Sequence, residues 1–149
     1  MKRTLLIELK NKIGDEVRIR GSVETIRDQG KIIFFIIKDR SASVQAVCWI
    51  GNGEELFNTA KKVTTESIVD VTGIVKEAKQ VLAGYELEIK NLVVDSLAQT
   101  PLPIVIEEEH SDNLTALNKR LDYRWIEKKK KKNHLMFEVA TTMTKALRD

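Results

Sequence analysis

Three side chains in the first ninety residues have the chemistry needed to hold a nucleic-acid base: an aromatic ring, an amide and a carboxylate. Phe34 lies in the apolar run IIFFII, Gln45 follows eleven positions later, and Glu88 lies in the segment YELEIK. An exposed ring can stack on a base, and polar side chains beside it can hydrogen-bond to the base edge. Stacking contributes about 1–3 kcal/mol per base, whereas an exposed charge pair contributes about 0–1 kcal/mol. The ring at position 34 therefore matters most to this hypothesis.

The alternation of side chains along a strand decides whether these three groups share a surface. Gln45 and Glu88 each lie between two apolar residues, so a strand that buries those neighbours turns both polar side chains outward. Phe34 has the same parity as Lys38, which places it on the solvated side and leaves Phe35 for the core. A phenylalanine within such a run is also a common core residue, so the buried alternative stays open for Phe34.

Apolar periodicity predicts the elements that must position these groups. The expected elements are a helix over 4–13, strands over 16–24, 31–39, 44–50, 67–79 and 85–97, and a helix over 54–63. Turns are expected at 28–30 and 40–43, and Gly84 is expected in a hairpin loop. In the last strand, the inward face is expected to carry Leu87, Ile89 and Val93.

Five strands need partners, because an open sheet would leave its edges exposed. A five-stranded, partly open Greek-key barrel with a helix between strands three and four meets this requirement. The sequence therefore predicts a mainly β protein, an OB-fold barrel followed by a short α-helical appendage. OB-folds commonly bind oligonucleotides, although other small barrels also use five strands.

Composition limits the other classes of protein. The chain has 149 residues and is 42% hydrophobic, which is enough for a core. No apolar run approaches about 20 residues, and charges interrupt the N-terminal apolar segment, so neither a membrane span nor a secretory signal is expected. The single cysteine, Cys48, is expected in the core and fits a reducing, cytoplasmic setting. The net charge of +3 is too small to indicate nucleic-acid binding by itself.

No pattern typical of catalysis or metal binding is present. His110 and His134 are isolated, and no glycine-rich phosphate loop or nucleophile motif occurs. Basic residues outnumber acidic ones across the first two strands, which weakly favours phosphate contact. The lysine run 128–132 could follow a phosphate backbone or could be a solvated loop.

The chain changes character near Gln99. Both prolines follow this point, so residues 100–112 are expected to form a linker, with a short strand over 104–106. Residues 113–149 are expected to form helices over 113–127 and 135–147. We therefore assign residues 1–99 to the barrel domain and residues 113–149 to a separate helical part.

Several stretches carry a resemblance to one family. GSVETIRDQGKIIFFIIKDRSASVQAV resembles the first three strands of the anticodon-binding domain of aspartyl-tRNA synthetases, and ESIVDVTGIVKEA with YELEIKNLVV is similar to its last two. PLPIVIEE resembles the hinge of these proteins, and NKRLDYRW resembles the start of their catalytic domain. MFEVATTMTKALRD resembles the start of their class II motif 1 helix. The likeness is greatest to eukaryotic and archaeal members, and asparaginyl and lysyl synthetases share part of it.

The resemblance implies roles for six residues. Phe34 matches the aromatic residue that stacks on the central anticodon base, a uridine, and Gln45 matches the glutamine that reads this base. Glu88 matches the glutamate that approaches the first anticodon base. The turn that contacts the anticodon stem-loop corresponds to Arg27, Gln29 and Gly30.

The resemblance also sets expectations for the whole protein. It implies a cytoplasmic, homodimeric aspartate–tRNA ligase that binds the anticodon stem-loop of tRNA(Asp) and uses ATP and magnesium. The given chain stops within motif 1 and lacks motifs 2 and 3, so we expect it to hold no catalytic residue, metal or cofactor and not to aminoacylate tRNA alone. Around Gln80 and Val81 we find no counterpart of a polar residue that some relatives place against the anticodon.

Three alternatives stay open. The chain could be the same domain of an asparaginyl- or lysyl-tRNA synthetase. It could be a free-standing OB module that binds single strands without sequence preference. It could also have a structural role in which the C-terminal helices mediate association.

Overall fold

The computed structural model describes residues 2–81, 83–104, 106 and 115–148. The chain divides into two compact units, Met1–Thr100 and Pro101–Asp149. Residues 107–112 of the expected linker, His110 among them, lie outside the described residues.

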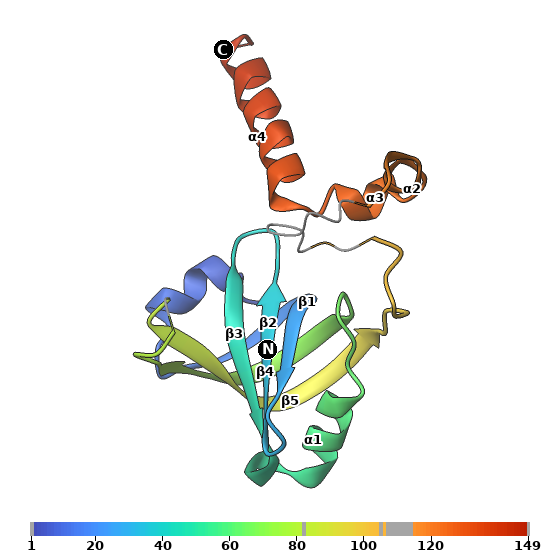
Figure 1. Cartoon of the computed structure of the whole chain (residues 1–149). Coiled ribbons are helices and arrows are strands. Elements are labelled where there is room, and N and C mark those ends of the chain that lie inside the picture. Colours follow the sequence, from blue (N-terminus) through green and yellow to red (C-terminus); the bar gives the residue numbers. More distant parts are fainter. Residues whose placement is uncertain (1, 82, 105, 107–114, 149) are drawn as a thin grey trace. The chain divides into compact units, whose positions relative to one another are not determined.

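The first unit is a closed five-stranded barrel (Figure 1). Its strands are β1 (Glu16–Asp28), β2 (Ile32–Lys38), β3 (Ser43–Trp49), β4 (Ile68–Glu77) and β5 (Tyr85–Ser96). They are hydrogen-bonded in the order β1-β2-β3-β5-β4, and β4 also pairs with β1. Only the β3–β5 pair is parallel among these strands. Between β3 and β4 the chain forms the 3-10 helix η2 (Ile50–Asn52) and the helix α1 (Glu54–Lys61). This arrangement is the predicted OB-fold barrel with its helix between strands three and four.

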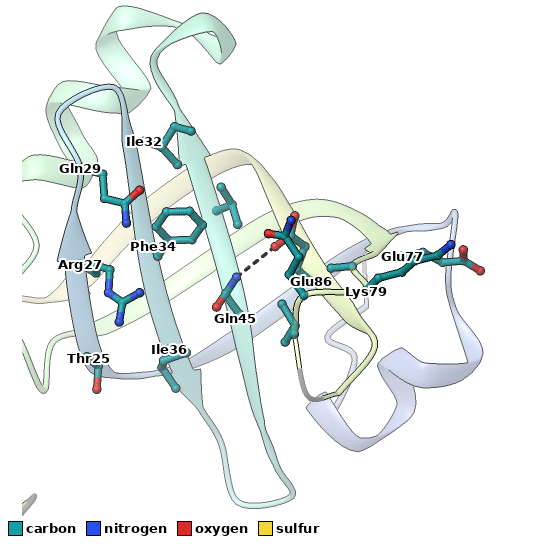
Figure 2. Close-up of a pocket in the computed structure, with 14 residues that line it drawn as sticks. Thr25, Arg27, Gln29, Ile32, Phe34, Ile36, Gln45, Glu77, Lys79 and Glu86 are labelled. Carbon is teal, nitrogen blue, oxygen red and sulfur yellow. Dashed lines mark hydrogen bonds between the residues drawn. The ribbon is translucent and has the colours of Figure 1, made fainter.

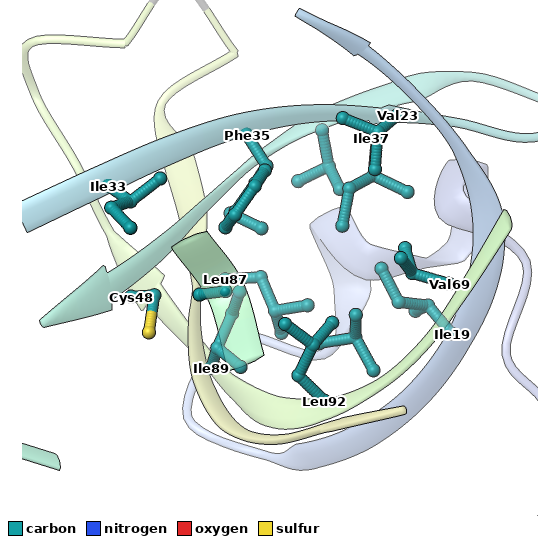
Figure 3. Packing of buried hydrophobic residues seen from close by; sticks show 14 of the residues in the cluster. Ile19, Val23, Ile33, Phe35, Ile37, Cys48, Val69, Leu87, Ile89 and Leu92 are labelled. Carbon is teal, nitrogen blue, oxygen red and sulfur yellow. The ribbon is translucent and has the colours of Figure 1, made fainter. Parts of the chain in front are cut away.

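The barrel core follows the alternation predicted from the sequence (Figure 3). Along β2 every second side chain is buried, and Phe35 is 1% exposed, whereas Phe34 remains partly exposed. Cys48 is buried in the same core, and this burial raises the pKa of its thiol. Because β2 and β3 are buried on one face only, the outward positions of Phe34 and Gln45 are fixed by the core itself.

One strand departs from the predicted alternation. The register between β4 and β5 shifts between Thr72 and Gly73, and Lys90 is the extra residue in β5. A β-bulge of this kind moves the side chains that follow it to the opposite face. Leu92 is therefore buried and Val93 is half exposed, so the predicted inward position of Val93 is wrong.

The N-terminal segment forms the 3-10 helix η1 (Leu6–Asn11) in place of the helix predicted over 4–13. The difference has a tertiary cause. Arg3 forms a bridge with Arg18 of β1, and the N–H of Thr4 donates to the Arg18 carbonyl at 2.8 Å. These bonds hold residues 3 and 4 in an extended conformation, so the helical turns begin only at Leu6.

A single carboxylate ties η1 to the β2–β3 turn. Asp39 accepts hydrogen bonds from the backbone N–H groups of Ser41, Ala42 and Leu6 at 2.7, 3.1 and 3.1 Å. Burial alone would raise the pKa of Asp39, but the hydrogen bonds, those from Ser41 first, outweigh it and lower the pKa. The predicted turn at 40–43 is thereby fixed from two sides.

The second unit contains three helices in its described part: α2 (Leu117–Asp122), α3 (Arg124–Glu127) and α4 (Lys131–Ala146). The single helix predicted over 113–127 is wrong within the described residues, because the Tyr123 backbone leaves the helical region at φ −110° and ψ 39°. An ion pair between Arg120 and the buried Glu127 joins the two sides of this break.

Two other predictions for the second unit also change. Ile104 and Ile106 belong to no strand, so the strand predicted over 104–106 is wrong for both of these residues. The last helix begins at Lys131, inside the lysine run, rather than at residue 135. No helix in the described part of the chain is both long and apolar enough to cross a membrane.

Candidate nucleic-acid interface

The outer face of the barrel brings side chains from four strands into cross-strand rows. In one row, Arg27 of β1 is opposite Phe34 of β2, Phe34 is opposite Val47 of β3, and Val47 is opposite Glu88 of β5. The neighbouring row contains Thr25, Ile36, Gln45 and Glu86. Adjacent strands lie about 4.8 Å apart, so these rows form one continuous surface.

This surface is one wall of an open hollow of about 750 Å³ (Figure 2). The polar and aromatic side chains around it include Arg27, Gln29, Phe34, Gln45 and Glu86. Glu77 at the end of β4 and residues 78–81 of the β4–β5 connection lie across from them. The hollow therefore combines residues from Thr25 to Glu86, 61 positions apart in the chain, that meet only because the barrel closes.

Phe34 lies in the middle of this wall. Its ring is partly exposed, with Ile32 and Ile36 on the same side of β2 and Val47 opposite it on β3. Figure 2 shows the ring between the guanidinium of Arg27 and the amide of Gln45. The buried alternative for Phe34 is thus excluded, and the ring has the setting that base stacking requires, an aromatic face beside aliphatic neighbours and polar groups.

Gln45 and Glu86 form a hydrogen-bonded pair on this wall. The Gln45 Nε2 donates to the Glu86 Oε2 at 3.1 Å, and the pair is marked by the dashed line in Figure 2. This bond uses one of the two N–H groups of the amide and orients its carbonyl oxygen. An amide presents a donor and an acceptor side by side, which matches the N3–H and O4 groups of uracil.

Glu88 shares the outer face but does not line the hollow. Its carboxylate forms ion pairs with Lys76 and, at 2.7 Å, with Lys90, and it accepts a hydrogen bond from Asn52 at 3.2 Å. Hydrogen bonds from Lys76 first and Lys90 second lower the pKa of Glu88 to about 2, so it is ionised at neutral pH. These contacts connect β5 to β4 and to η2. Glu86, two residues earlier on the same face of β5, lines the hollow.

The turn before β2 holds the other predicted residues. The Asp28 Oδ1 accepts a hydrogen bond from the Gly30 N–H at 2.7 Å, and Gly30 has a φ of +84°, which favours glycine. The Gln29 N–H donates to the Ile32 carbonyl at 2.9 Å and closes the hairpin. Arg27 and Gln29 line the hollow, and Gly30 supplies the backbone conformation that allows the turn.

The cations of the first two strands divide into two groups. Carboxylates bind Arg18 at 2.7 Å, Arg20 at 2.8 Å and Lys38 at 3.7 Å. The hydrogen bond from Arg18 lowers the pKa of its partner Asp70. By contrast, Arg27 and Lys31 are exposed and form no ion pair within the described residues. Arg27, which is opposite Phe34, is therefore available to a phosphate group.

The sequence analysis missed two contributors to the hollow. Glu86 has the same parity as Glu88, so alternation predicts an outward position for both and cannot choose between them. Gln80 and Val81, for which we found no counterpart by resemblance, lie in the β4–β5 connection that lines the hollow. The pairing of Gln45 on β3 with Glu86 on β5 would have identified Glu86. This pairing cannot be predicted from the sequence, because the register of these two strands is set when the barrel closes.

Among the residues that the structure describes, no group of His, Cys, Asp and Glu side chains could hold a metal ion. His134 lies 3.2 Å from Glu138 on α4, an i,i+4 pair on the helix surface.

Comparison with known proteins agrees with this geometry. A family model described as tRNA_anti-codon, an OB-fold nucleic acid binding domain, matches residues 17–95. The chain belongs to this anticodon-binding OB-fold family. Its match covers all five barrel strands except the ends of β1 and β5.

Relatives of this OB-fold domain are found among tRNA ligases. The chain is 32% identical over its whole length to the asparagine–tRNA ligase of Desulforamulus reducens and 34% identical over 91% of its length to the aspartate–tRNA(Asp/Asn) ligase of Methanocaldococcus jannaschii. It covers 33% and 31% of these proteins. The solved asparaginyl-tRNA synthetase of Pyrococcus horikoshii, in complex with asparaginyl-adenylate, superimposes with a TM-score of 0.88. That structure is 32% identical, and the match covers 99% of this chain and 33% of the synthetase.

The anticodon-binding OB domain therefore corresponds to the N-terminal region of aspartate and asparagine ligases of the class II archaeal and eukaryotic type. The chain spans about one third of the length of these relatives.

Proposed function

We propose that this domain binds the anticodon loop of tRNA(Asp) on the outer face formed by Phe34, Gln45 and Glu86. The observation that carries the proposal is the exposed Phe34 ring, which shares one hollow with a hydrogen-bonded amide–carboxylate pair. This setting offers stacking and edge recognition at the same place.

Each side chain has a distinct task in this mechanism. Phe34 stacks on the central anticodon base, a uridine, after the loop bases have unstacked. Gln45 reads the edge of that base through its free N–H and its carbonyl oxygen. Glu86 carries a carboxylate, which only accepts hydrogen bonds when ionised, so it favours a base edge rich in donors, such as that of guanine. Arg27 contacts a phosphate group, and Gln29 and Gly30 form the turn beside it.

Replacing Phe34 with alanine tests the proposal. The Phe34→Ala chain is expected to bind an anticodon stem-loop of tRNA(Asp) about 5- to 150-fold more weakly, because one stacked base is lost. Calorimetric titration measures this affinity, and Phe34→Tyr is expected to retain most of it. Trp125→Ala, which removes an exposed aromatic ring from the second unit, is the matched control. Unchanged affinity in Phe34→Ala would contradict the proposal.

For the whole protein we propose aspartate–tRNA ligase activity in the cytoplasm, as a homodimer, with ATP and magnesium as its cofactors. The support is the likeness to aspartate and asparagine ligases over nearly the whole chain. The given chain would supply anticodon recognition and would not aminoacylate tRNA by itself.

The asparagine ligase alternative rests on the match to the Desulforamulus reducens protein over the full chain. Anticodons for aspartate, asparagine and lysine all carry a central uridine, so Phe34 and Gln45 serve all three readings equally. Hairpins that differ only at the third anticodon base separate aspartate from asparagine recognition. Equal affinity for oligo(dT) and for the anticodon hairpin would instead favour a module without sequence preference.

A further inference from the structure

A second aromatic ring extends the surface that contains Phe34. Trp49 is the last residue of β3 and lies opposite Ile32 of β2. Its backbone is extended, at φ −109° and ψ 140°, so the alternation of β3 continues through it. Trp49 therefore faces the same side as Gln45 and Val47, and it is 50% exposed. Along the direction of the strands, Trp49 is displaced from Phe34 by two residues, or about 7 Å.

The backbone around Trp49 is held in place from two sides. The Ile50 N–H donates to the Lys31 carbonyl at 3.1 Å. The Asn52 side chain donates to Glu88 and to the Ile89 carbonyl, both at 3.2 Å. A backbone anchored in this way holds the attachment point of the ring in place, which lowers the entropic cost of binding.

The ring of Trp49 lies directly over Gly51. A Cβ atom at position 51 would come within 2.4 Å of two atoms of the ring. Only glycine at position 51 leaves space for the ring, so Gly51 allows the ring to pack against the backbone. The exposed side of the indole remains available for a stacking partner.

Charge around Trp49 favours a nucleotide over an apolar protein segment. Lys31 precedes β2 beside it and is exposed, and neither Lys31 nor Arg27 forms an ion pair within the described residues. An aromatic ring with unpaired cations nearby is the arrangement by which proteins hold successive bases and their phosphates.

We propose that Trp49 stacks on the nucleotide next to the one held by Phe34, so that the two rings bind consecutive unstacked bases. The proposal rests on the function proposed above, and it adds one subsite to it. The 7 Å shift is about twice the 3.4 Å rise between stacked bases of one strand, so consecutive bases reach both rings only when the strand is splayed. Such splaying is typical of single-strand recognition.

The experiment uses the full chain with Trp125→Phe, which leaves Trp49 as the only tryptophan. The probe is the tRNA(Asp) anticodon hairpin, together with two hairpins that carry an abasic site immediately 5′ or 3′ of the central uridine. Stacking of a base on Trp49 is expected to quench its fluorescence at saturation. Trp49→Ala is expected to weaken binding of the intact hairpin about 5- to 150-fold, and Trp49→Phe less. Trp49→Ala should have no further effect on one of the two abasic hairpins, whose missing base is the one it holds.

Two results would overturn this subsite. One is unchanged fluorescence at saturation together with unchanged affinity in Trp49→Ala, while Phe34→Ala still weakens binding; anticodon recognition would then stand without Trp49. The other is an equal effect of Trp49→Ala on all three hairpins, which would indicate a general loss of structure. If Phe34→Ala also leaves the affinity unchanged, the proposed function itself fails. Thermal unfolding of Trp49→Ala and Trp49→Phe checks that both variants remain folded.

Discussion

At the scale of single residues, Glu86 and Glu88 have the same chemistry and lie two positions apart, yet their surroundings give them different tasks. Glu86 bonds only to Gln45 within the described residues and lines the hollow. Glu88 is surrounded by Lys76, Lys90 and Asn52. We therefore expect Glu86 to serve recognition and Glu88 to serve stability.

The matched pair Glu86→Gln and Glu88→Gln tests this division. Glu86→Gln removes a charged acceptor from the hollow, so hairpin affinity should fall about 10-fold while the melting temperature changes little. Glu88→Gln should leave hairpin affinity within about twofold and lower the melting temperature. Titration and thermal unfolding of both variants give the comparison. The reverse pattern would show that Glu88 is the residue that contacts RNA.

The depressed pKa of Glu88 predicts a pH dependence of stability. Its folded pKa of about 2 lies below the ordinary value of 4.5, so its contribution is fully present above about pH 4.5 and is lost as the pH falls toward 2. Because Lys76 and Lys90 are 56% and 40% exposed, solvent screening limits this contribution to about 1 kcal/mol. Urea unfolding of wild type and Glu88→Gln should differ by this amount at pH 6 and converge at low pH. A constant difference across this range would contradict the assignment.

The sequence correctly predicted the outward faces of Phe34 and Gln45 and the burial of Cys48, because each lies within a strand that is buried on one face, where alternation is decisive. It could not choose Glu86 over Glu88, because both glutamates have the same parity. The choice depends on the parallel register of β3 and β5, which pairs residues that are 41 positions apart in the chain.

At the scale of elements, barrel closure depends on places where two strands approach closely. A Cβ atom on Gly73 of β4 would lie 2.2 Å from the carbonyl oxygen of Glu88 on β5. Gly73 also flanks the register shift that produces the bulge at Lys90. The glycine thus permits the local bend of β4 and β5.

Gly73→Ala is expected to lower the free energy of unfolding by about 1–3 kcal/mol, because backbone must move to admit the methyl group. Ala83→Gly, at an exposed loop position, is the control and should change stability by less than about 1 kcal/mol. Chemical denaturation measures both. A Gly73→Ala chain as stable as wild type would mean that β4 and β5 can move apart at this point without loss of free energy of unfolding.

The bulge also explains where element-level prediction failed. The predicted alternation of β5 agrees with the structure up to Ile89. Beyond Lys90 the observed alternation is inverted, so the prediction placed Val93 on the wrong face. A bulge has no distinct composition in a segment such as IKNLVV. The sequence analysis did not predict the helix break at Tyr123, because the apolar spacing around it remains helical. The ion pair between Arg120 and Glu127 that joins the two sides of the break is a tertiary contact.

At the scale of the whole molecule, the net charge of +3 gives no hint of RNA binding, because the 25 Lys and Arg residues are nearly balanced by 22 Asp and Glu residues. What matters is that the unpaired Arg27 lies beside Phe34. The first unit contains every described residue around the hollow, so it holds the complete proposed recognition surface.

This charge distribution predicts the salt dependence of binding. Arg27→Ala should reduce the slope of log affinity against log salt by about 0.7, the value for one phosphate contact on a single strand. Arg20→Ala is the matched control, because Arg20 is already paired with Asp95 at 2.8 Å. Titrations between 50 and about 200 mM salt give the slopes. Equal slopes for wild type and Arg27→Ala would remove Arg27 from the interface.

The central claim is that the face carrying Phe34 and Gln45 reads the middle base of the anticodon. Its most direct test is the affinity of the wild-type chain and of Gln45→Ala for two hairpins that differ only in a central uridine or cytidine. The account predicts that wild type prefers uridine by about 5- to 150-fold, as for one mismatched base, and that Gln45→Ala loses most of this preference. Equal affinity of the wild-type chain for both hairpins would contradict it.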